Sequence, residues 1–318
     1  MIKKDKRDIV MTETTREIFE KYQVRKNKKQ KTAFIKYVEN LADKWGYSHH
    51  VEKGTFGARN IVVGDISKAK VVYTAHYDTC PVLPFPNFIT PKCIALYLLY
   101  QVGIIFGIFA AVAIGIGVLA FLADALNLGT DFTFWATEIA YFGLLFLLLA
   151  GPANKHTAND NTSGVTLLID IMRELPEEER DTVAFVFFDL EEMGLFGSMS
   201  FARKHKKEMK DKLLLNFDCV SDGENMLFAL RKKAGKYQTA IETAFQTKDG
   251  FKVDVAHKGV FYPSDQMQFP CGVGVAALRS TKSGLLYMNR IHTRRDVIYC
   301  EENIDFLKSG ALELPKLI

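Results

Sequence analysis

Cysteine is scarce in this sequence, and the cysteines present form no metal-binding pattern. The 318 residues contain five of them, Cys80, Cys93, Cys219, Cys271 and Cys300. Their spacing excludes a zinc ribbon and a CxxC redox motif, and an odd number cannot pair completely into disulfides. A reducing compartment is therefore the simplest expectation for this chain.

A strong net charge is also lacking, and the N-terminal region has no apolar segment. The formal net charge of +4 is too small to indicate a nucleic-acid partner, and we expect none. The first residues are charged rather than apolar, so we expect no secretory signal peptide. Many basic residues lie near the N-terminus: Lys3, Lys4, Lys6, Arg7, Arg25, Lys26, Lys28, Lys29 and Lys31. They form either a solvated, partly disordered face or a surface that attracts anionic lipid headgroups.

Charge is almost absent from two long apolar runs. Residues 94–122 contain no charged side chain, and residues 132–150 contain only Glu138. A helix that crosses the hydrocarbon core needs ~20 apolar residues, and soluble helices of such length carry a polar stripe. The runs therefore predict a two-helix transmembrane hairpin, the alternative being a pair of buried core helices. The first run is longer than a bilayer is thick, so it should tilt or begin above the membrane surface.

The charges around the hairpin predict its orientation. The connection, residues 123–131, has two aspartates and no Lys or Arg, whereas both flanking regions are rich in basic residues. By the positive-inside rule the connection lies outside and the body of the protein is cytoplasmic. We therefore expect a multi-pass protein of the cell membrane with two helices. Gln101 and Glu138, the polar exceptions, are expected to contact the other helix or reach the interface rather than catalyse.

The remaining sequence alternates between helical and strand patterns. It predicts helices at 11–22, 30–45, 165–175, 198–206, 237–245 and 302–312, and strands at 60–63, 71–75, 182–188, 212–217 and 273–278. Such alternation is typical of a three-layer α/β sandwich with a mixed, largely parallel central sheet. We expect one domain built from residues 1–92 and 152–318, interrupted by the hairpin at 93–151.

Residues suited to metal binding follow the predicted strands. His76 and Asp78 are two positions apart at a strand end, so their side chains can face the same way. A histidine ligand usually donates its other ring nitrogen to a carboxylate, and Asp78 is placed to lie near it. Open α/β sheets place their sites at the carboxyl ends of strands. We therefore expect a metal site that gathers His76, Asp160, Glu192, Asp218 and His292.

The adjacent carboxylates Glu191 and Glu192 predict a particular chemistry. Neighbouring side chains at a strand exit point in different directions, so one can bind metal while the other handles a proton. Hydrolysis at a metal needs this division, because the ion lowers the pKa of bound water toward ~7 and a carboxylate shuttles its proton. The alternative is a solvated acidic loop.

Five motifs occur in a fixed order along the soluble part of the chain, from about Asn60 to Asp296. They are AHYDT at 75–79, NDNTSG at 159–164, FFDLEEMGLFGS at 187–198, NFD at 216–218 and RIHTRRD at 290–296. Together they resemble the co-catalytic di-zinc aminopeptidases of metallopeptidase family twenty-eight, the family of bacterial leucyl aminopeptidase and glutamate carboxypeptidase.

The resemblance implies a role for each matching residue. Two divalent ions, most simply Zn²⁺, would share Asp160 as a bridge, with His76 and Asp218 on one ion and Glu192 and His292 on the other. Glu191 would be the general base and later the acid that protonates the leaving amine. Asp78 would be the partner of His76, Asp296 would support the region of His292, and the peptide bond after Asp160 would be cis.

The sequence departs from the family at two places. Ser264-Asp265-Gln266 resembles a Ser-Asp-His element with Gln in place of His, and Tyr262 lies near a tyrosine that hydrogen-bonds the oxyanion in some relatives, although its register leaves that role open. The hairpin stands between His76 and Asp160, where soluble members have a short connection. It would hold the catalytic mouth near the bilayer, either for a membrane-associated substrate or as a simple tether.

The expected function is a membrane-anchored zinc metallo-aminopeptidase that hydrolyses N-terminal peptide bonds with a metal-bridging hydroxide and Glu191 as base. Its expected partners are a hydrophobic or membrane-associated peptide substrate and the lipid bilayer; the oligomeric state is left open. Three alternatives stay open. They are a carboxypeptidase or dipeptidase of the same family, a glutaminyl-cyclase-like acyl transfer enzyme, and a non-catalytic membrane scaffold with a peptidase-like fold.

Overall fold

A mixed, nine-stranded sheet forms the centre of the protein. The computed structural model describes residues 11–126, 130–247 and 251–318, so Lys3, Lys4, Lys6 and Arg7 lie outside the described residues. The strands are β1 (His49–Lys53), β2 (Arg59–Val63), β3 (Val71–His76), β4 (Val183–Phe188), β5 (Leu213–Phe217), β6 (Asn225–Leu230), β7 (Lys252–Ala256), β8 (Gly272–Ser280) and β9 (Leu286–Tyr287). Their order is β1-β2-β4-β3-β5-β8-β6-β7, with β9 beside β8.

The middle of the sheet is parallel, and antiparallel pairs join it to the flanking strands on both sides, while β6 and β7 pair in parallel at one edge. Strands β4, β3, β5 and β8 pair in parallel, whereas β2 pairs antiparallel with β1 and β4, and β6 runs antiparallel to β8. Every residue of β4 is buried, as is typical of a parallel strand covered on both faces. The predicted α/β class and central sheet are confirmed, while β1, β6, β7 and β9 were not predicted.

Helices cover both faces of this sheet. One core lies beneath α1 (Glu13–Lys21), α2 (Lys28–Lys44), α5 (Gly164–Glu174), α7 (Gln238–Ala244) and α8 (Glu301–Glu313). The opposite face is covered by α6 (Phe196–Lys204), where the rings of Phe188 and Phe201 lie 5.6 Å apart. The start of α2 is fixed by a capping box, in which Asn27 accepts the Gln30 amide and Gln30 accepts the Asn27 amide. The predicted three-layer arrangement is therefore confirmed.

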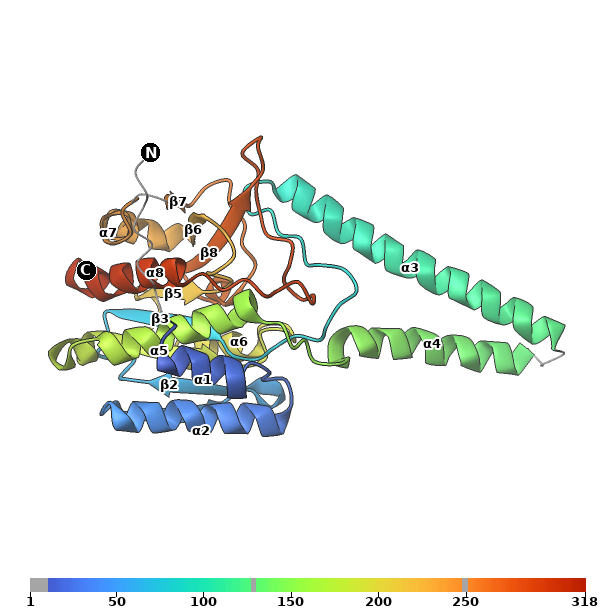
Figure 1. The fold of residues 1–318 in the computed structure, drawn as a ribbon, viewed down its shortest axis with the longest axis horizontal. Coiled ribbons are helices and arrows are strands. Elements are labelled where there is room, and N and C mark those ends of the chain that lie inside the picture. The colour runs from blue at the N-terminus through green and yellow to red at the C-terminus, as the bar shows by residue number, and fades with distance from the viewer. Residues whose placement is uncertain (1–10, 127–129, 248–250) are drawn as a thin grey trace.

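Two long apolar helices project from one end of this body. They are α3 (Ile94–Ala125) and α4 (Thr130–Ala150), which converge toward their far ends in Figure 1. Apolar side chains face outward along both helices; Phe106 is 69% and Phe142 is 61% exposed. Both helices are long and apolar enough to cross a membrane, and neither apolar stretch is buried in the body. The alternative of two buried core helices is therefore wrong.

The first two turns of α3 belong to the body rather than to the projecting hairpin. The Tyr100 hydroxyl donates to the Pro86 carbonyl at 2.6 Å, and the Gln101 side-chain amide donates to Asn87 at 3.2 Å. The rest of α3, residues 102–125, would extend about 36 Å at 1.5 Å per residue. That length is close to the ~30 Å hydrocarbon core. It agrees with the expectation that the first run begins above the membrane surface.

Gly164 provides a test of the close packing between α5 and β5. A β-carbon there would lie 2.2 Å from the Phe217 carbonyl oxygen and 2.6 Å from Asn161 Oδ1. We expect Gly164→Ala to lower the free energy of unfolding by about 1–3 kcal/mol or more, because overpacking forces the backbone to move. Thermal unfolding of detergent-purified protein measures this, with Gly115→Ala as the control because nothing lies within 4 Å of that position. Equal melting temperatures for the two variants would contradict this packing.

Candidate active site

The five predicted metal ligands converge at the carboxyl ends of the parallel strands. His76 is the last residue of β3, the Glu191-Glu192 pair lies in the loop after β4, and Asp218 directly follows β5. Asp160 lies in the turn that leads into α5, and His292 lies in the loop after β9. The chain order differs from the spatial order, because β3 pairs with both β4 and β5. That pairing brings residues from both sides of the hairpin together.

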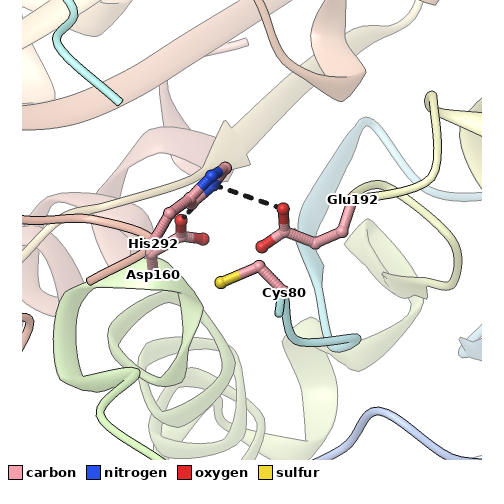
Figure 2. A group of neighbouring side chains, drawn as sticks. All are labelled: Cys80, Asp160, Glu192 and His292. Carbon is pink, nitrogen blue, oxygen red and sulfur yellow. Dashed lines mark ion pairs between the residues drawn. The ribbon is translucent and has the colours of Figure 1, made fainter. Parts of the chain in front are cut away.

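The two carboxylate oxygens of Asp160 face two different groups of side chains. Its Oδ1 lies 3.2 Å from His76 Nε2, which in turn lies 3.5 Å from Asp218 Oδ1. Its Oδ2 lies 3.1 Å from His292 Nε2, which lies 3.2 Å from Glu192 Oε2, as Figure 2 shows. Two three-residue groups therefore share one buried carboxylate, the first with His76 and Asp218 and the second with His292 and Glu192.

Burial and close charges shift the pKa values of this cluster. Burial raises the pKa of Glu192 to about 7, against the attraction of His292. Burial lowers the pKa of His292, but Glu192 and Asp160 outweigh it and raise that pKa to about 9. For Asp160, burial raises the pKa, and the hydrogen bonds from His292 and His76 more than reverse this, so its pKa is lowered. Mutual attraction between carboxylates and imidazoles thus holds the cluster together.

The donor set fits divalent cations. Imidazole nitrogens and carboxylate oxygens are the usual ligands of catalytic zinc. The Glu192 side chain is 7% exposed, yet its Oε1 is buried with no hydrogen-bond partner. A buried carboxylate oxygen without a partner carries a large desolvation cost, which a bound cation would offset. His76, Asp160 and Asp218 could hold one such ion, and Asp160, Glu192 and His292 could hold another.

Asp78 lies beside His76, as the strand-end spacing predicts, and it also fixes the two glutamates. Its Oδ1 is 3.7 Å from His76 Nδ1, which has the Asp78 carbonyl oxygen at 3.1 Å. The same carboxylate accepts the backbone N–H groups of Glu191 at 3.0 Å and Glu192 at 3.3 Å. Asp78 therefore connects the end of β3 to the loop after β4. Its predicted partnership with His76 stays a prediction.

Glu191 lies close to His76 and Glu192. One of its oxygens lies within 4.8 Å of ligand atoms of His76 and Glu192. Burial raises the pKa of Glu191 well above its ordinary value; the charges of Glu192, Asp265 and Asp218 add to this, whereas His76 opposes it. A carboxylate with a raised pKa, close to a metal-type cluster, is suited to accept and return a proton.

Asp296 supports Asp160 rather than His292. Its two carboxylate oxygens accept the backbone N–H groups of Asn159 at 2.8 Å and Asp160 at 2.9 Å. Burial and the nearby Asp160 charge raise the pKa of Asp296 to about 8. The Asp160–Asn161 peptide bond is cis, as the resemblance implies. The turn that presents Asp160 is thus held by a residue more than a hundred positions away in the sequence.

Tyr262 lies at the cluster with its hydroxyl proton already engaged. The hydroxyl donates to the Asp218 carbonyl oxygen at 2.9 Å, and the Tyr262 carbonyl accepts from the Gln266 side chain at 2.6 Å. Gln266, the departure from the family's histidine, also accepts from Asn216 at 3.2 Å. In this arrangement Tyr262 and Gln266 form hydrogen bonds with Asp218 and Asn216 at the end of β5. The oxyanion-binding role of Tyr262 stays a prediction.

Three residues near the site were not predicted. The Arg25 guanidinium is fully buried and donates to the carbonyl oxygens of Tyr22 and Tyr77, and Lys31 forms a buried ion pair with Asp189. The interpretation of Arg25 and Lys31 as solvated or lipid-facing is therefore wrong. Lys31 shares a helix face with the buried residue Phe34, three positions on, which is the sequence signal for its burial. Cys80 is the third, and it lies within the group of Asp160, Glu192 and His292.

The backbone around the cluster is strained. Among the described residues, the non-glycine positions with positive φ include Leu190 (56°), Cys219 (60°) and His292 (63°). Each of these is a candidate ligand or lies within two positions of one. Such conformations cost of order 1–3 kcal/mol each and gather at functional sites, where the surrounding structure holds them in place.

The fold and the cluster define a three-layer α/β protein with a histidine and carboxylate centre suited to metal at the carboxyl ends of its strands. The sequence pattern of peptidase family M28 matches residues 143–306, slightly more than half of the chain. The chain therefore belongs to peptidase family M28. The matched range includes Asp160, Glu191, Glu192, Asp218 and His292, while His76 and Asp78 lie on the other side of the hairpin.

Solved structures with the same fold include an aminopeptidase, a glutaminyl cyclase and an exopeptidase. The Legionella pneumophila LapA aminopeptidase aligns with a TM-score of 0.56 at 13% identity, covering 96% of this chain and 68% of that one. A Porphyromonas gingivalis glutaminyl cyclase gives 0.56 at 14% identity, covering 94% and 96%. A Zn-dependent exopeptidase from Parabacteroides distasonis gives 0.54 at 13% identity, covering 95% and 97%. A search of curated proteins found no match. At these identities the likeness establishes the fold alone.

Proposed function

We propose that this chain is a membrane-anchored metallo-aminopeptidase whose catalytic body faces the cytoplasm. It would hold two divalent ions, for which zinc is the proposed metal. The observation that carries the proposal is the position of Asp160, whose two oxygens face separate groups of buried ligand-type side chains. Family membership and the donor set support a hydrolytic metallopeptidase. The aminopeptidase assignment rests on the five motifs and on the aminopeptidases and exopeptidase that share the fold.

The residues of this chain divide the work of hydrolysis between them. When bound, the ions would lower the pKa of a water molecule toward ~7 and polarise the scissile carbonyl. Glu191 takes the proton of the attacking water and later returns it to the leaving amine. Asp78 orients Glu191 and Glu192 through their backbone amides, and Asp296 orients Asp160 in the same way. The Oε1 oxygen of Glu192, which has no hydrogen-bond partner, is available as a ligand.

The surroundings of the site favour a hydrophobic peptide close to the membrane. The chain segments that precede and follow the hairpin meet beside the cluster, where the Val82 amide donates to the Pro152 carbonyl at 2.9 Å. A groove of about 480 Å³ opens there, lined by Val82, Leu83, Pro84, Pro86, Thr293, Arg294 and Arg295. Its apolar wall begins four residues after Asp78, and Thr293 directly follows His292. Such a wall suits an apolar side chain at the N-terminus of the substrate.

Product analysis tests the activity. Detergent-purified protein is supplied with zinc and a mixed peptide library, and the products are identified by mass spectrometry. We expect stepwise removal of N-terminal residues from peptides with a free amine and none from the same peptides after N-acetylation. Trimming from the carboxyl end would indicate a carboxypeptidase. No cleavage of any peptide would favour a scaffold and contradict the proposal.

Glutaminyl cyclisation is the second candidate function, because glutaminyl cyclases share the fold to the same extent as the aminopeptidases. In that reaction an N-terminal glutamine amine attacks its own side-chain amide and releases ammonia. Peptides that begin with glutamine distinguish the two activities. The aminopeptidase releases free glutamine and a shortened peptide, whereas a cyclase leaves a peptide of full length with a blocked N-terminus.

The proposed topology predicts opposite labelling of two engineered cysteines. Ala125, at the far end of α3, and Lys206, on the surface of the body, are both exposed. In a background without the partly exposed Cys93 and Cys300, we expect a membrane-impermeant maleimide to label Ala125→Cys in intact cells. Lys206→Cys should react only after the membrane is permeabilised. Equal labelling of both variants in intact cells would contradict a cytoplasmic body.

A further inference from the structure

Cys80 is fixed at the point where both flanks of the hairpin meet the cluster. It follows the AHYDT motif directly, and its carbonyl oxygen accepts the Asn154 amide at 3.0 Å. Pro81 pairs with Ala153 in an isolated β-bridge next to it. The residue is 1% exposed, yet it belongs to none of the three hydrophobic clusters of the described chain. Packing in the apolar core therefore does not account for its position.

The sulfur of Cys80 lies among ligand-type atoms. Cys80, Asp160, Glu192 and His292 each offer one ligand atom, and these four atoms all lie within 4.8 Å of one another. Figure 2 shows the thiol directed into the space beside the Asp160 and Glu192 carboxylates. The other group, His76, Asp160 and Asp218, offers nitrogen and oxygen only.

A second observation points independently to a cation at this position. Glu192 Oε2 faces His292, but Glu192 Oε1 is buried without a hydrogen-bond partner. The side chain is only 7% exposed, and Figure 2 shows its free oxygen on the side of Cys80. A carboxylate oxygen and a thiol that share a buried space are two of the ligand types that zinc binds.

We propose that Cys80 is a ligand of the ion held by Asp160, Glu192 and His292. This inference rests on the proposed function, since it concerns one of the two ions of that site. It makes the two positions unequal: four protein side chains would enclose the second ion, whereas His76, Asp160 and Asp218 would leave a place open on the first. Closed four-ligand sites are typical of structural zinc, and open three-ligand sites are typical of catalytic zinc. A thiolate also favours zinc over manganese or magnesium at the second position.

X-ray absorption at the zinc edge tests the inference in zinc-loaded, detergent-purified protein. We expect a sulfur neighbour at ~2.3 Å from zinc in the wild type and its loss in Cys80→Ser and Cys80→Ala. Cys219→Ser is the matched control, because Cys219 is buried beside the first group and donates to Asp218 Oδ1 at 3.1 Å. It should keep the sulfur neighbour. We also expect Cys80→Ser to weaken the binding of one zinc ion by more than the roughly 10–100-fold that outer partners of ligands contribute.

The possible results separate the inference from the proposed function. Zinc bound through nitrogen and oxygen alone in the wild type would overturn the role of Cys80 and leave the two-ion peptidase intact. A sulfur neighbour that is lost in Cys219→Ser and kept in Cys80→Ser would also overturn it. Wild-type protein that binds no zinc would contradict both the proposed function and the inference that Cys80 is a ligand. Circular dichroism of each variant verifies that the comparison is between folded proteins.

Discussion

Glu191→Gln should abolish peptide hydrolysis and leave the bound metal in place. The substitution keeps the size of the side chain but removes its capacity to accept a proton, which contributes about 10²–10⁴-fold to the rate in general acid–base catalysis. The neighbouring ligand Glu192 keeps its contact with His292, and the backbone amide of residue 191 can still donate to Asp78. The measurement is kcat for release of N-terminal residues, together with metal content by mass spectrometry.

The control for this variant is Glu208→Gln, the same change at an exposed glutamate that belongs to none of the ligand groups of the described residues. It should retain wild-type turnover and metal. If Glu191→Gln keeps a rate within tenfold of the wild type, Glu191 is not the base. If it loses metal together with activity, Glu191 acts as a ligand, and the division of work between the two adjacent glutamates is wrong.

Asp160→Ala should weaken the binding of both ions at once and reduce activity to background. Asp160 is the only residue that belongs to both main ligand groups of the described chain, and its two oxygens lie 3.2 Å from His76 and 3.1 Å from His292. Without it the first group is reduced to His76 and Asp218, which is a weak set for a catalytic ion. The second group loses the carboxylate that it shares with the first and keeps His292, Glu192 and the neighbouring Cys80. Metal content per chain, measured after dialysis against a fixed free zinc concentration, reports the loss.

Asp218→Ala is the matched comparison, because Asp218 belongs to the first group only. It should lose one ion and bind the other as the wild type does, whereas Asp160→Ala should bind both ions more weakly. The same metal content in the two variants would contradict a shared carboxylate. Thermal unfolding of both proteins without metal separates ligand loss from misfolding. Removal of a buried charge that two histidines contact destabilises the apo protein as well.

Local sequence was sufficient to predict the ligand cluster. His76, Glu192 and Asp218 each follow an apolar strand, and parallel strands bring their carboxyl ends to one edge whatever their order. The helices α3 and α4 could also be predicted from sequence, since their composition alone predicts long apolar helices. The strands β1, β6 and β7 could not be predicted from sequence. Strand β1 contains two histidines and two charges, and β6 and β7 lie at the flank of the sheet. Their pairing depends on tertiary contacts rather than on a period-two pattern.

Contacts between distant segments account for the rest of what sequence did not predict. Asp296 holds the Asp160 turn from a position 136 residues away, and the acceptor of the Tyr262 hydroxyl is a carbonyl oxygen 44 residues earlier. Nothing in the spacing around Arg25 reveals that it donates to a carbonyl at the end of β3. Cys80 directly follows the AHYDT motif, but a single cysteine does not indicate a metal ligand from sequence alone. The structure is needed to show Glu192 and His292 beside it.

Anomalous diffraction from zinc-loaded crystals of the full chain tests the central claim most directly. Two zinc peaks, one on each side of the Asp160 carboxylate, are the predicted result. The first should lie among His76, Asp160 and Asp218, and the second should lie beside Glu192 and His292. A single peak, or two peaks that do not share Asp160, would contradict the two-ion site from which the peptidase mechanism is built.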